Sequence, residues 1–405
     1  MKTSAIILNT AHPSATTKVY GLLVLERTFH ALERAGVEAV LLPGAEEERL
    51  QEVIGRNDGW KIKFRFVDHF RSAIAEQKNG ILVLAAPLVL DQKIPEKLME
   101  EGAGKTDVLV DDKGLIAYFP QAFLQKIKSI PKELNGWLEK AEIEDFKIKS
   151  LDFQGLVCNT VFSEAEKKSV MKALIRSLTK PTDGWVSRNL NRPVSTLFSR
   201  VLAHTPVTPN QFTVVAGLLG LATGVFFALG GYWNYLIGGA LFHFTSIMDG
   251  VDGELARLKY KSSPFGQWLD TLVDNLSYLA ALAGIITGIF RNGASEPVKI
   301  AGILAVVFAV LALGSLYLYL LRFKSGGTLL NVEYSFQGGD GFFDKFMQVA
   351  AAFGKRDLFA LIFFGLGIIG QMPMALGYVA IMAFFVFAFS IQAHFAAAKK
   401  RRGVE

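Results

Sequence analysis

Residues 249–274 read DGVDGELARLKYKSSPFGQWLDTLVD, and long apolar segments adjoin both ends of this stretch. Asp249 and Asp252 are three residues apart, a spacing that places both side chains on one face of a helix. Asp270 and Asp274 are four residues apart and predict a second such face. The stretch therefore predicts two helices, joined by a short loop, that direct four carboxylates toward a common space.

Carboxylates at the edge of a bilayer are hard to desolvate, and several together repel one another unless cations neutralise them. Hard oxygen ligands, with no cysteine and no cluster of histidines beside them, favour Mg²⁺, Mn²⁺ or Ca²⁺ over zinc. We therefore expect Asp249, Asp252, Asp270 and Asp274 to bind divalent metal. A pair of metal ions would suit phosphoryl chemistry on a pyrophosphate. The alternative is a set of acidic helix termini that only face water.

The spacing of the fixed residues carries a family resemblance. The pattern D-x-x-D-G-x-x-A-R, eight residues, then G-x-x-x-D-x-x-x-D resembles the signature of the CDP-alcohol phosphotransferase (CDP-alcohol phosphatidyltransferase) family, and every fixed position is present. The resemblance implies an integral membrane enzyme that transfers a substituted phosphate from a CDP-alcohol to an acceptor hydroxyl and releases CMP. It implies a pair of Mg²⁺ or Mn²⁺ ions as cofactor, with Asp274 as general base in addition to metal ligand. The product would be a phospholipid or an inositol phosphodiester, and the enzyme would be a homodimer.

Small and basic residues near the aspartates are candidates for substrate binding. Arg257 can give a forked hydrogen bond to a phosphate. Asn210 is carried over from a Pro-Asn pair near the nucleotide site of the family, although it could equally cap its helix. Arg322 and Arg356 could bind an anionic lipid or polyol-phosphate acceptor or merely flank membrane spans, and the loop 325–354 between them could cover that site. Small residues would let CMP approach the backbone, and those expected there are Gly250, Gly253, Ala256 and Gly266.

The composition predicts two domains. Of the 405 residues 51% are hydrophobic, and the apolar excess lies after about residue 205. We expect a cytoplasmic α/β domain at 1–161, a linker with a juxtamembrane amphipathic helix at 162–205, and a membrane domain at 206–405. The formal net charge of +6 comes from bases beside apolar spans and does not indicate a nucleic-acid partner. The single cysteine, Cys158, excludes an intrachain disulfide.

Short apolar runs alternate with helical ones in the first domain and predict an α/β fold around a largely parallel, Rossmann-like sheet. Their order resembles a sugar-phosphate nucleotidyltransferase domain. Such a domain needs a glycine-rich loop after its first strand, but the loop Asn9–Lys18 has no glycine. The metal-binding aspartate of that family is replaced by Ala86, and Asp91 lies further along, so we expect a catalytically degenerate domain. The predicted strands are 5–8, 38–42, 61–67, 80–85, 107–110 and 115–119.

The junction contains two predicted helices. Ser163 and Glu166 form a capping box that opens the first. The second has an apolar face flanked by arginines and is expected to lie in the membrane interface, the alternative being a linker helix packed on the first domain. The run from Lys180 to Arg188 resembles the junction of family members fused to a nucleotidyltransferase domain, the di-myo-inositol-phosphate-phosphate synthases among them. The apolar face comprises Val194, Leu197, Phe198, Val201 and Leu202.

The apolar segments after residue 205 predict an all-α polytopic domain with six transmembrane helices, because a span needs roughly 20 apolar residues. Lys and Arg gather at one end of these segments, so the positive-inside rule places the first domain and the aspartates on the cytoplasmic side of the inner (plasma) membrane. The start of the chain has too short an apolar run for a signal peptide. The predicted spans are 209–230, 232–256, 266–289, 298–321, 357–371 and 373–396.

Two other functions fit parts of this sequence. A bifunctional enzyme would also make the CDP-alcohol from CTP in its first domain, and CTP turnover by that domain would support it. A cation transporter could use the aspartates as an ion pathway. A transporter is expected to spread ionisable residues through the depth of the membrane, whereas here they gather at the ends of two predicted spans.

Overall fold

The computed structural model describes residues 3–69, 74, 77, 79–127, 134, 146–180, 183–323, 341 and 353–402. The chain divides into two compact units, which we describe separately. The first unit holds the residues up to Leu178 together with the short segments Ala203–Thr205 and Leu258–Tyr260. The second holds Thr179–Leu202, Pro206–Arg257 and the rest of the chain.

The first unit is built on a seven-stranded sheet with the strand order β10-β8-β9-β6-β1-β4-β5. Only β9 runs antiparallel to its neighbours, so the predicted α/β fold with a largely parallel sheet is confirmed. The strands are β1 Ser4–Ile7, β4 Ala39–Pro43, β5 Lys63–Val67, β6 Ile81–Leu84, β8 Val108–Asp111, β9 Ile116–Phe119 and β10 Ile148–Leu151.

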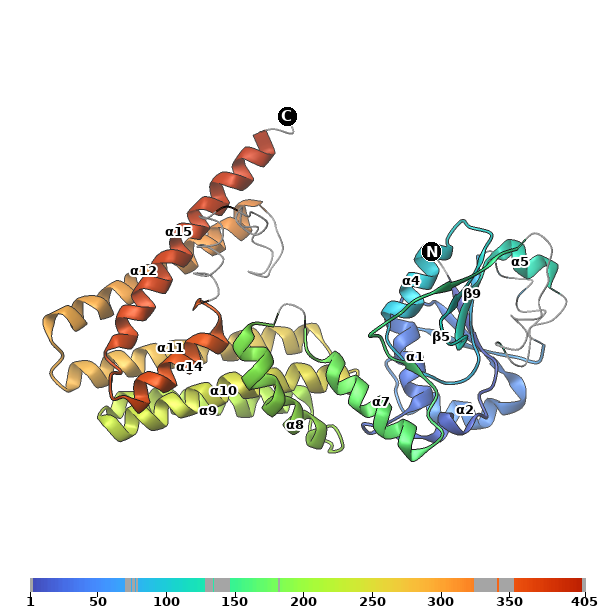
Figure 1. The fold of residues 1–405 in the computed structure, drawn as a ribbon, viewed down its shortest axis with the longest axis horizontal. Coiled ribbons are helices and arrows are strands. Elements are labelled where there is room, and N and C mark those ends of the chain that lie inside the picture. Colours follow the sequence, from blue (N-terminus) through green and yellow to red (C-terminus); the bar gives the residue numbers. More distant parts are fainter. Residues whose placement is uncertain are drawn as a thin grey trace. The chain divides into compact units, whose positions relative to one another are not determined.

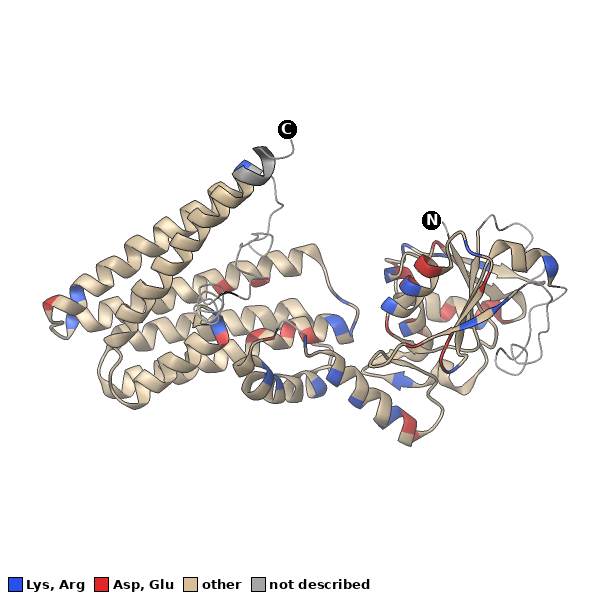
Figure 2. Ribbon diagram, turned by 45° about the horizontal axis from the view of Figure 1, so that its top comes forward, with Lys and Arg blue, Asp and Glu red and all other residues tan. Residues whose placement is uncertain are grey.

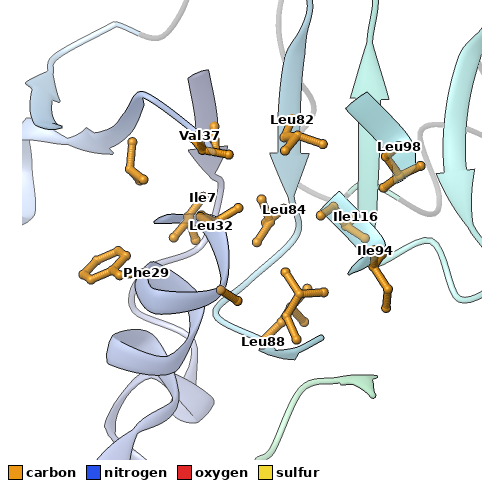
Figure 3. Close-up of a cluster of buried hydrophobic side chains, with 14 of the residues drawn as sticks. Ile7, Phe29, Leu32, Val37, Leu82, Leu84, Leu88, Ile94, Leu98 and Ile116 are labelled. Carbon is orange, nitrogen blue, oxygen red and sulfur yellow. The ribbon is translucent and has the colours of Figure 1, made fainter. Parts of the chain in front are cut away.

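The core of this unit explains why its strands read as continuous apolar runs. Strands such as β1 and β6 are buried along their whole length, as expected for a parallel sheet covered on both faces. Figure 3 shows Leu82 and Leu84 of β6 in the same cluster as Phe29 and Leu32 of helix α1 (Val24–Arg34). The amphipathic period of α1 therefore places its apolar face in the core.

The junction begins in the first unit. Helix α7 (Glu164–Ser177) opens with the predicted capping box, in which Ser163 and Glu166 exchange hydrogen bonds. Its buried residues Val170 and Ile175 belong to the first unit, and the Tyr20 hydroxyl donates to the Met171 carbonyl. The unit therefore extends beyond the predicted boundary at residue 161, because α7 uses its apolar side for packing.

The second unit consists of helices, and three of them, α9, α10 and α11, run side by side (Figure 1). Figure 2 shows these long helices almost free of charge except near certain ends. The helices are α8 Arg192–Leu202, α9 Pro209–Leu229, α10 Tyr232–Leu258, α11 Pro264–Arg291, α12 Glu296–Phe323, α14 Arg356–Ile368 and α15 Met374–Arg402.

Each of the six predicted spans corresponds to a helix, but the count of six is not confirmed. Among the described residues four helices are long and apolar enough to cross a membrane: α9, α11, α12 and α15. Helix α14 has 13 residues, too few to cross a bilayer, and α10 carries the acidic end that contains Asp249 and Asp252.

Helix α8 buries polar residues and exposes apolar ones. Ser195 and Ser199 are 1% and 0% exposed, whereas Leu197 and Val201 are 56% and 60% exposed. A helix on the surface of a water-soluble protein buries its apolar residues and exposes its polar ones, and α8 does the reverse. This supports the predicted position of α8 in a lipid interface.

Glycines bring the backbones of α9 and α11 into direct contact. A Cβ atom on Gly284 of α11 would lie 2.2 Å from the carbonyl oxygen of Gly224 on α9, and one on Gly288 would lie 2.0 Å from that of Phe227. On the α9 side, a Cβ on Gly220 would lie 2.1 Å from the Ser277 hydroxyl. Small residues at such a seam allow close packing where apolar burial gives little driving force.

We predict that Gly284→Ala separates α9 from α11, because the new methyl group meets a backbone carbonyl that cannot rotate away. The expected loss is ~1–3 kcal/mol of stability, the usual result of overpacking. Thermal unfolding in detergent measures it. Gly314→Ala in α12 is the matched control, since a Cβ there has nothing within 4 Å and should leave the melting temperature unchanged. Equal melting temperatures for both variants would contradict a tight seam.

Candidate metal and nucleotide site

Three of the four predicted metal ligands lie together. Asp249 on α10 and Asp270 and Asp274 on α11 each offer a carboxylate oxygen, and these atoms all lie within 4.8 Å of one another. Helix α11 starts at Pro264, and the Ser263 hydroxyl accepts a hydrogen bond from the Gly266 amide, which fixes the start of the helix. The carboxylates are hard oxygen donors in a compact group, and this chemistry fits Mg²⁺ or Mn²⁺.

Arg356, at the start of α14, pairs with two of these aspartates. Its Nη1 lies 2.7 Å from Asp249 Oδ1 and 2.5 Å from Asp274 Oδ1. The guanidinium carbon lies 5.2 Å from the centre of the Tyr278 ring. The arginine that we expected at the acceptor site therefore also balances the charge of the aspartates.

Asp252, the fourth predicted ligand, is held by a residue that the sequence did not single out. It is 8% exposed, and one of its oxygens accepts a hydrogen bond of 2.5 Å from the Thr213 hydroxyl of α9. The other oxygen accepts from the Gly253 amide. Thr213 lies one helical turn after Pro209, on the face of α9 that meets α10. This spacing from the Pro-Asn pair is the feature of the sequence that could have indicated Thr213 as a site residue.

One polar cavity of about 230 Å³ brings together most of the residues predicted to bind nucleotide. A Cβ on Gly266 would lie 2.9 Å from Asn210 Oδ1, so only glycine leaves this approach open. Half-buried Arg257 has a buried Nε with no hydrogen-bond partner among the described residues, so this donor could bind a ligand. We refer to this 230 Å³ cavity as the nucleotide cavity. Its lining includes Lys180, Asn210, Thr213, Asp252, Gly253, Ala256, Arg257, Lys261, Gly266 and Asp270.

A second cavity, of about 240 Å³, lies beside Asp249 and Arg356. Gly250 lines this cavity and not the nucleotide cavity, so it is separated from Gly253, Ala256 and Gly266, with which we grouped it on the CMP side. The reason is helical geometry, since each residue turns by about 100° and Gly250 faces away from Ala256. We call this 240 Å³ cavity the second cavity. Its lining also includes Asp183, Ser187, Asn191, Arg192, Ser195, Ser246, Lys355 and Asp357.

Arg322 does not join Arg356. It is exposed at the end of α12, and neither cavity includes it in its lining. The expected pairing of the two arginines at one acceptor site is therefore not found in the part of the chain that the structure describes. The predicted cover, the loop 325–354, lies outside the described residues apart from Gly341, Phe353 and Gly354.

The junction supplies polar residues that the sequence did not assign to the site. Arg192 donates to both oxygens of Asp183 at 2.8 and 3.1 Å, and to Glu254 on α10 at 2.5 Å. Partial burial opposes the ionisation of Asp183, but the hydrogen bonds from Arg192 and the Lys180 amide outweigh it and lower the pKa of Asp183. Desolvation, followed by the charges of Arg257 and Arg192, lowers the pKa of Lys180. These contacts join residues up to 62 positions apart, so periodicity could not reveal them.

Comparison with known proteins decides the family. A profile described as CDP-alcohol phosphatidyltransferase matches residues 206–399. A relative from Aquifex aeolicus named "Bifunctional IPC transferase and DIPP synthase" is 42% identical over 323 residues, covering 67% of this chain and 72% of that protein. The chain belongs to the CDP-alcohol phosphatidyltransferase family. As a member it is a phosphotransferase enzyme of membranes, which confirms the predicted activity class.

Further relatives share parts of this CDP-alcohol phosphatidyltransferase. A Thermococcus kodakarensis protein of the same name as the Aquifex relative is 38% identical over 159 residues, covering 38% of this chain and 36% of that protein. An "archaetidylinositol phosphate synthase" from Pyrococcus horikoshii is 36% identical over 89 residues, covering 22% of this chain and 46% of that protein.

Solved structures resemble part of the chain only remotely. Rv0371C from Mycobacterium tuberculosis, in complex with manganese, is 14% identical with a TM-score of 0.33, covering 42% of this chain and 98% of that one. A 4-diphosphocytidyl-2C-methyl-D-erythritol synthase from Anaerococcus prevotii is 12% identical with a TM-score of 0.33, covering 43% and 98%.

We predict that Thr213→Val weakens the affinity for divalent metal about 10–100-fold, because Asp252 loses the hydroxyl that orients it. Titration of CMP formation with Mn²⁺, and Mn²⁺ binding measured by electron paramagnetic resonance, report the change. Thr223→Val is the matched control: Thr223 is also buried on α9, but its hydroxyl bonds only the Leu219 carbonyl. The same metal affinity in both variants would show that Thr213 does not orient the carboxylate.

Proposed function

We propose that this CDP-alcohol phosphotransferase joins the phosphate of a CDP-alcohol to a hydroxyl of a polyol phosphate, and so makes an inositol-type phosphodiester. The observation that carries the proposal is the cluster of Asp249, Asp270 and Asp274, with oxygens within 4.8 Å, between two polar cavities. One cavity would hold the donor and the other the acceptor. The names of the relatives, which include DIPP synthase and archaetidylinositol phosphate synthase, support products of this type.

The aspartates would hold the ions, and Asp252 would contribute from the nucleotide cavity. Mg²⁺ or Mn²⁺ would supply neutralisation of the diphosphate and of the charge that develops on the bridging oxygen. Arg257 would bind a phosphate oxygen of the donor through its free Nε. Asn210, Gly253, Ala256 and Gly266 would then surround the CMP part of the donor.

Asp274 is the proposed general base. The acceptor oxygen attacks the phosphorus that carries the alcohol, its proton passes to Asp274, and the bond to the bridging oxygen breaks so that CMP leaves. Arg356 now pairs with Asp274. An anionic acceptor that binds Arg356 would weaken this pair and leave Asp274 better able to take the proton.

The polar lining of the second cavity favours a polyol phosphate over a lipid alcohol as acceptor. Lys355 and Arg356 would face its phosphate, and Asp183 and Asp357 could accept hydrogen bonds from hydroxyls. Asn191 is 6% exposed and its Oδ1 has no hydrogen-bond partner within the described part of the chain, so it can accept from a ligand hydroxyl. A lipid would leave this acceptor unsatisfied.

We propose further that the first unit does not make the CDP-alcohol. The loop after β1 folds as a turn at Pro13–Thr16, and its buried Ser14 hydroxyl donates to the Pro87 carbonyl. Asp91 accepts from the Lys93 amide at the start of helix α4 (Lys93–Gly102), and buried Asp111 accepts from three amides of its own turn. These carboxylates are used for local structure. The bifunctional alternative draws its support from the relatives, whose names include an IPC transferase activity.

The location and assembly also belong to this proposal. The basic ends of the helices support an aspartate site on the cytoplasmic side of the inner membrane, as does the cytoplasmic origin of CDP-linked substrates. Family resemblance supports a homodimer. The bilayer is the solvent of the second unit, and its exposed apolar side chains support this role.

We predict that Asp270→Asn abolishes CMP release from a CDP-alcohol, because the cluster loses a charged ligand. Chelation of metal by EDTA should do the same to the unsubstituted protein, and Mg²⁺ or Mn²⁺ should restore it. Glu296→Gln, at the exposed start of α12, is the control and should retain full activity. Cation flux through liposomes without any CMP release would instead support the transporter.

We predict that the full chain carrying Asp270→Asn releases no pyrophosphate from CTP and a polyol phosphate. The substitution removes transfer in the second unit but leaves the first unit intact, so any pyrophosphate would come from the first unit. Pyrophosphate is measured by a coupled phosphate assay. Release at a rate comparable to transfer by the unsubstituted protein would establish the bifunctional enzyme.

A further inference from the structure

Lys180, between helices α7 and α8 of the junction, lies where a donor diphosphate would bind. We infer that Lys180 binds this diphosphate in the nucleotide cavity, and that Glu254 is a positioning residue that holds Lys180 there through Arg192 and Asp183. The inference rests on the proposed function and adds a residue from outside the aspartate stretch.

Glu254 anchors the junction to α10. It is 0% exposed, and its Oε1 accepts hydrogen bonds from the Ser195 hydroxyl at 2.8 Å and from Arg192 at 2.5 Å. Its Oε2 accepts from the Ser199 hydroxyl at 2.6 Å. A buried carboxylate with one arginine and two hydroxyls is fully satisfied, so breaking the set would leave an uncompensated charge.

Arg192 extends this contact to the turn that carries Lys180. Its Nε and Nη2 donate to the two oxygens of Asp183, a forked pair of fixed geometry. Asp183 Oδ2 in turn accepts from the Lys180 amide at 2.9 Å, and the Asp183 amide donates to the Lys180 carbonyl at 3.1 Å. The backbone of Lys180 is thereby connected, through the side chains of Asp183, Arg192 and Glu254, to the helix that carries Asp249 and Asp252.

The side chain of Lys180 lines the nucleotide cavity together with Arg257 and Lys261. Lys180 retains exposure to solvent, so a ligand in this cavity can reach it. Three cations at one cavity repel one another unless an anion lies between them, and the aspartates on the same cavity would be engaged by metal. A diphosphate supplies the missing negative charge, and a lysine is suited to bind it as a point charge.

The chain of contacts from Glu254 through Arg192 and Asp183 to Lys180, which we call the relay, also gives a reason for the burial of Glu254. A carboxylate on the outer face of α10 would serve solubility, but this one is buried against the two serines that α8 turns inward. The same contacts position Arg192 and Ser195 in the wall of the second cavity. Glu254 therefore links the placement of the junction to both cavities.

The first test is the kinetics of the full-length enzyme carrying Lys180→Ala, with a CDP-alcohol as varied substrate. We expect KM for the donor to rise about tenfold and kcat to change less than twofold, because an exposed lysine contributes to binding and not to the chemical step. Lys180→Arg should restore most of the affinity. Lys172→Ala, an exposed lysine of α7 outside the cavity, is the control and should match the unsubstituted enzyme.

The second test is the combination of Glu254→Gln with Lys180→Ala. If Glu254 acts through Lys180, Glu254→Gln should raise KM for the donor, and the double variant should be no worse than the more affected single variant. Should Glu254→Gln fail to fold, Asp183→Asn takes its place in the same cycle. Additive effects would overturn the relay.

Either half of the inference can fail while the proposed function stands. An unchanged donor KM in Lys180→Ala, with metal-dependent CMP release intact, would overturn the binding role of Lys180. Absence of CMP release by the unsubstituted enzyme with CDP-alcohols would instead overturn the proposed function itself.

Discussion

The site depends on the direct contact between the backbones of α9 and α11. Glycines at positions such as 224, 284 and 288 remove the side chains that would hold the two helices apart. The approach brings Asn210 of α9 to Gly266 of α11, while Thr213 of α9 bonds Asp252 on the neighbouring α10. In a membrane, where apolar burial favours no particular pairing of helices, such shape matching selects the neighbour. A wider spacing of α9 and α11 would move Asn210 and Thr213 away from Asp270, with which they line the nucleotide cavity.

The aspartate cluster creates the second constraint, since three half-buried carboxylates repel one another unless their charge is balanced. Arg356 pairs with Asp249 and Asp274, and the guanidinium lies close to the Tyr278 ring. Divalent ions would serve the same purpose during catalysis. The negative charge of the cluster would thus be balanced in two ways, by Arg356 of the chain and by divalent ions from solution. In the proposed mechanism, a substrate phosphate that binds Arg356 would shift the balance toward the ions and would couple acceptor binding to the ionisation of Asp274.

The junction is part of the site and not a passive connection. Its residues line both cavities, and the contacts of Arg192 with Asp183 and Glu254 fix it to α10. Helix α8 can turn Ser195 and Ser199 inward because its apolar residues face outward, as a lipid interface permits. The membrane therefore allows Ser195 and Ser199 to bond Glu254, whereas in water the exposure of the apolar residues of α8 would be unfavourable.

The sequence by itself determined most of the elements and the faces they present: the strands of the sheet other than β10, the capping box at Ser163, and the aspartates on two helices. Strand β10 was not predicted, because its residues are largely exposed and give no apolar run. These features are local, since they follow from hydrophobic period and from spacing within one turn. Only the tertiary structure decided that Thr213 bonds Asp252, that Gly250 lines the second cavity, that Arg322 lines neither cavity, and that Glu254 bonds Arg192 of the junction. Each of these depends on which helices are neighbours and how they are rotated, and side-chain spacing along one helix carries no information about either.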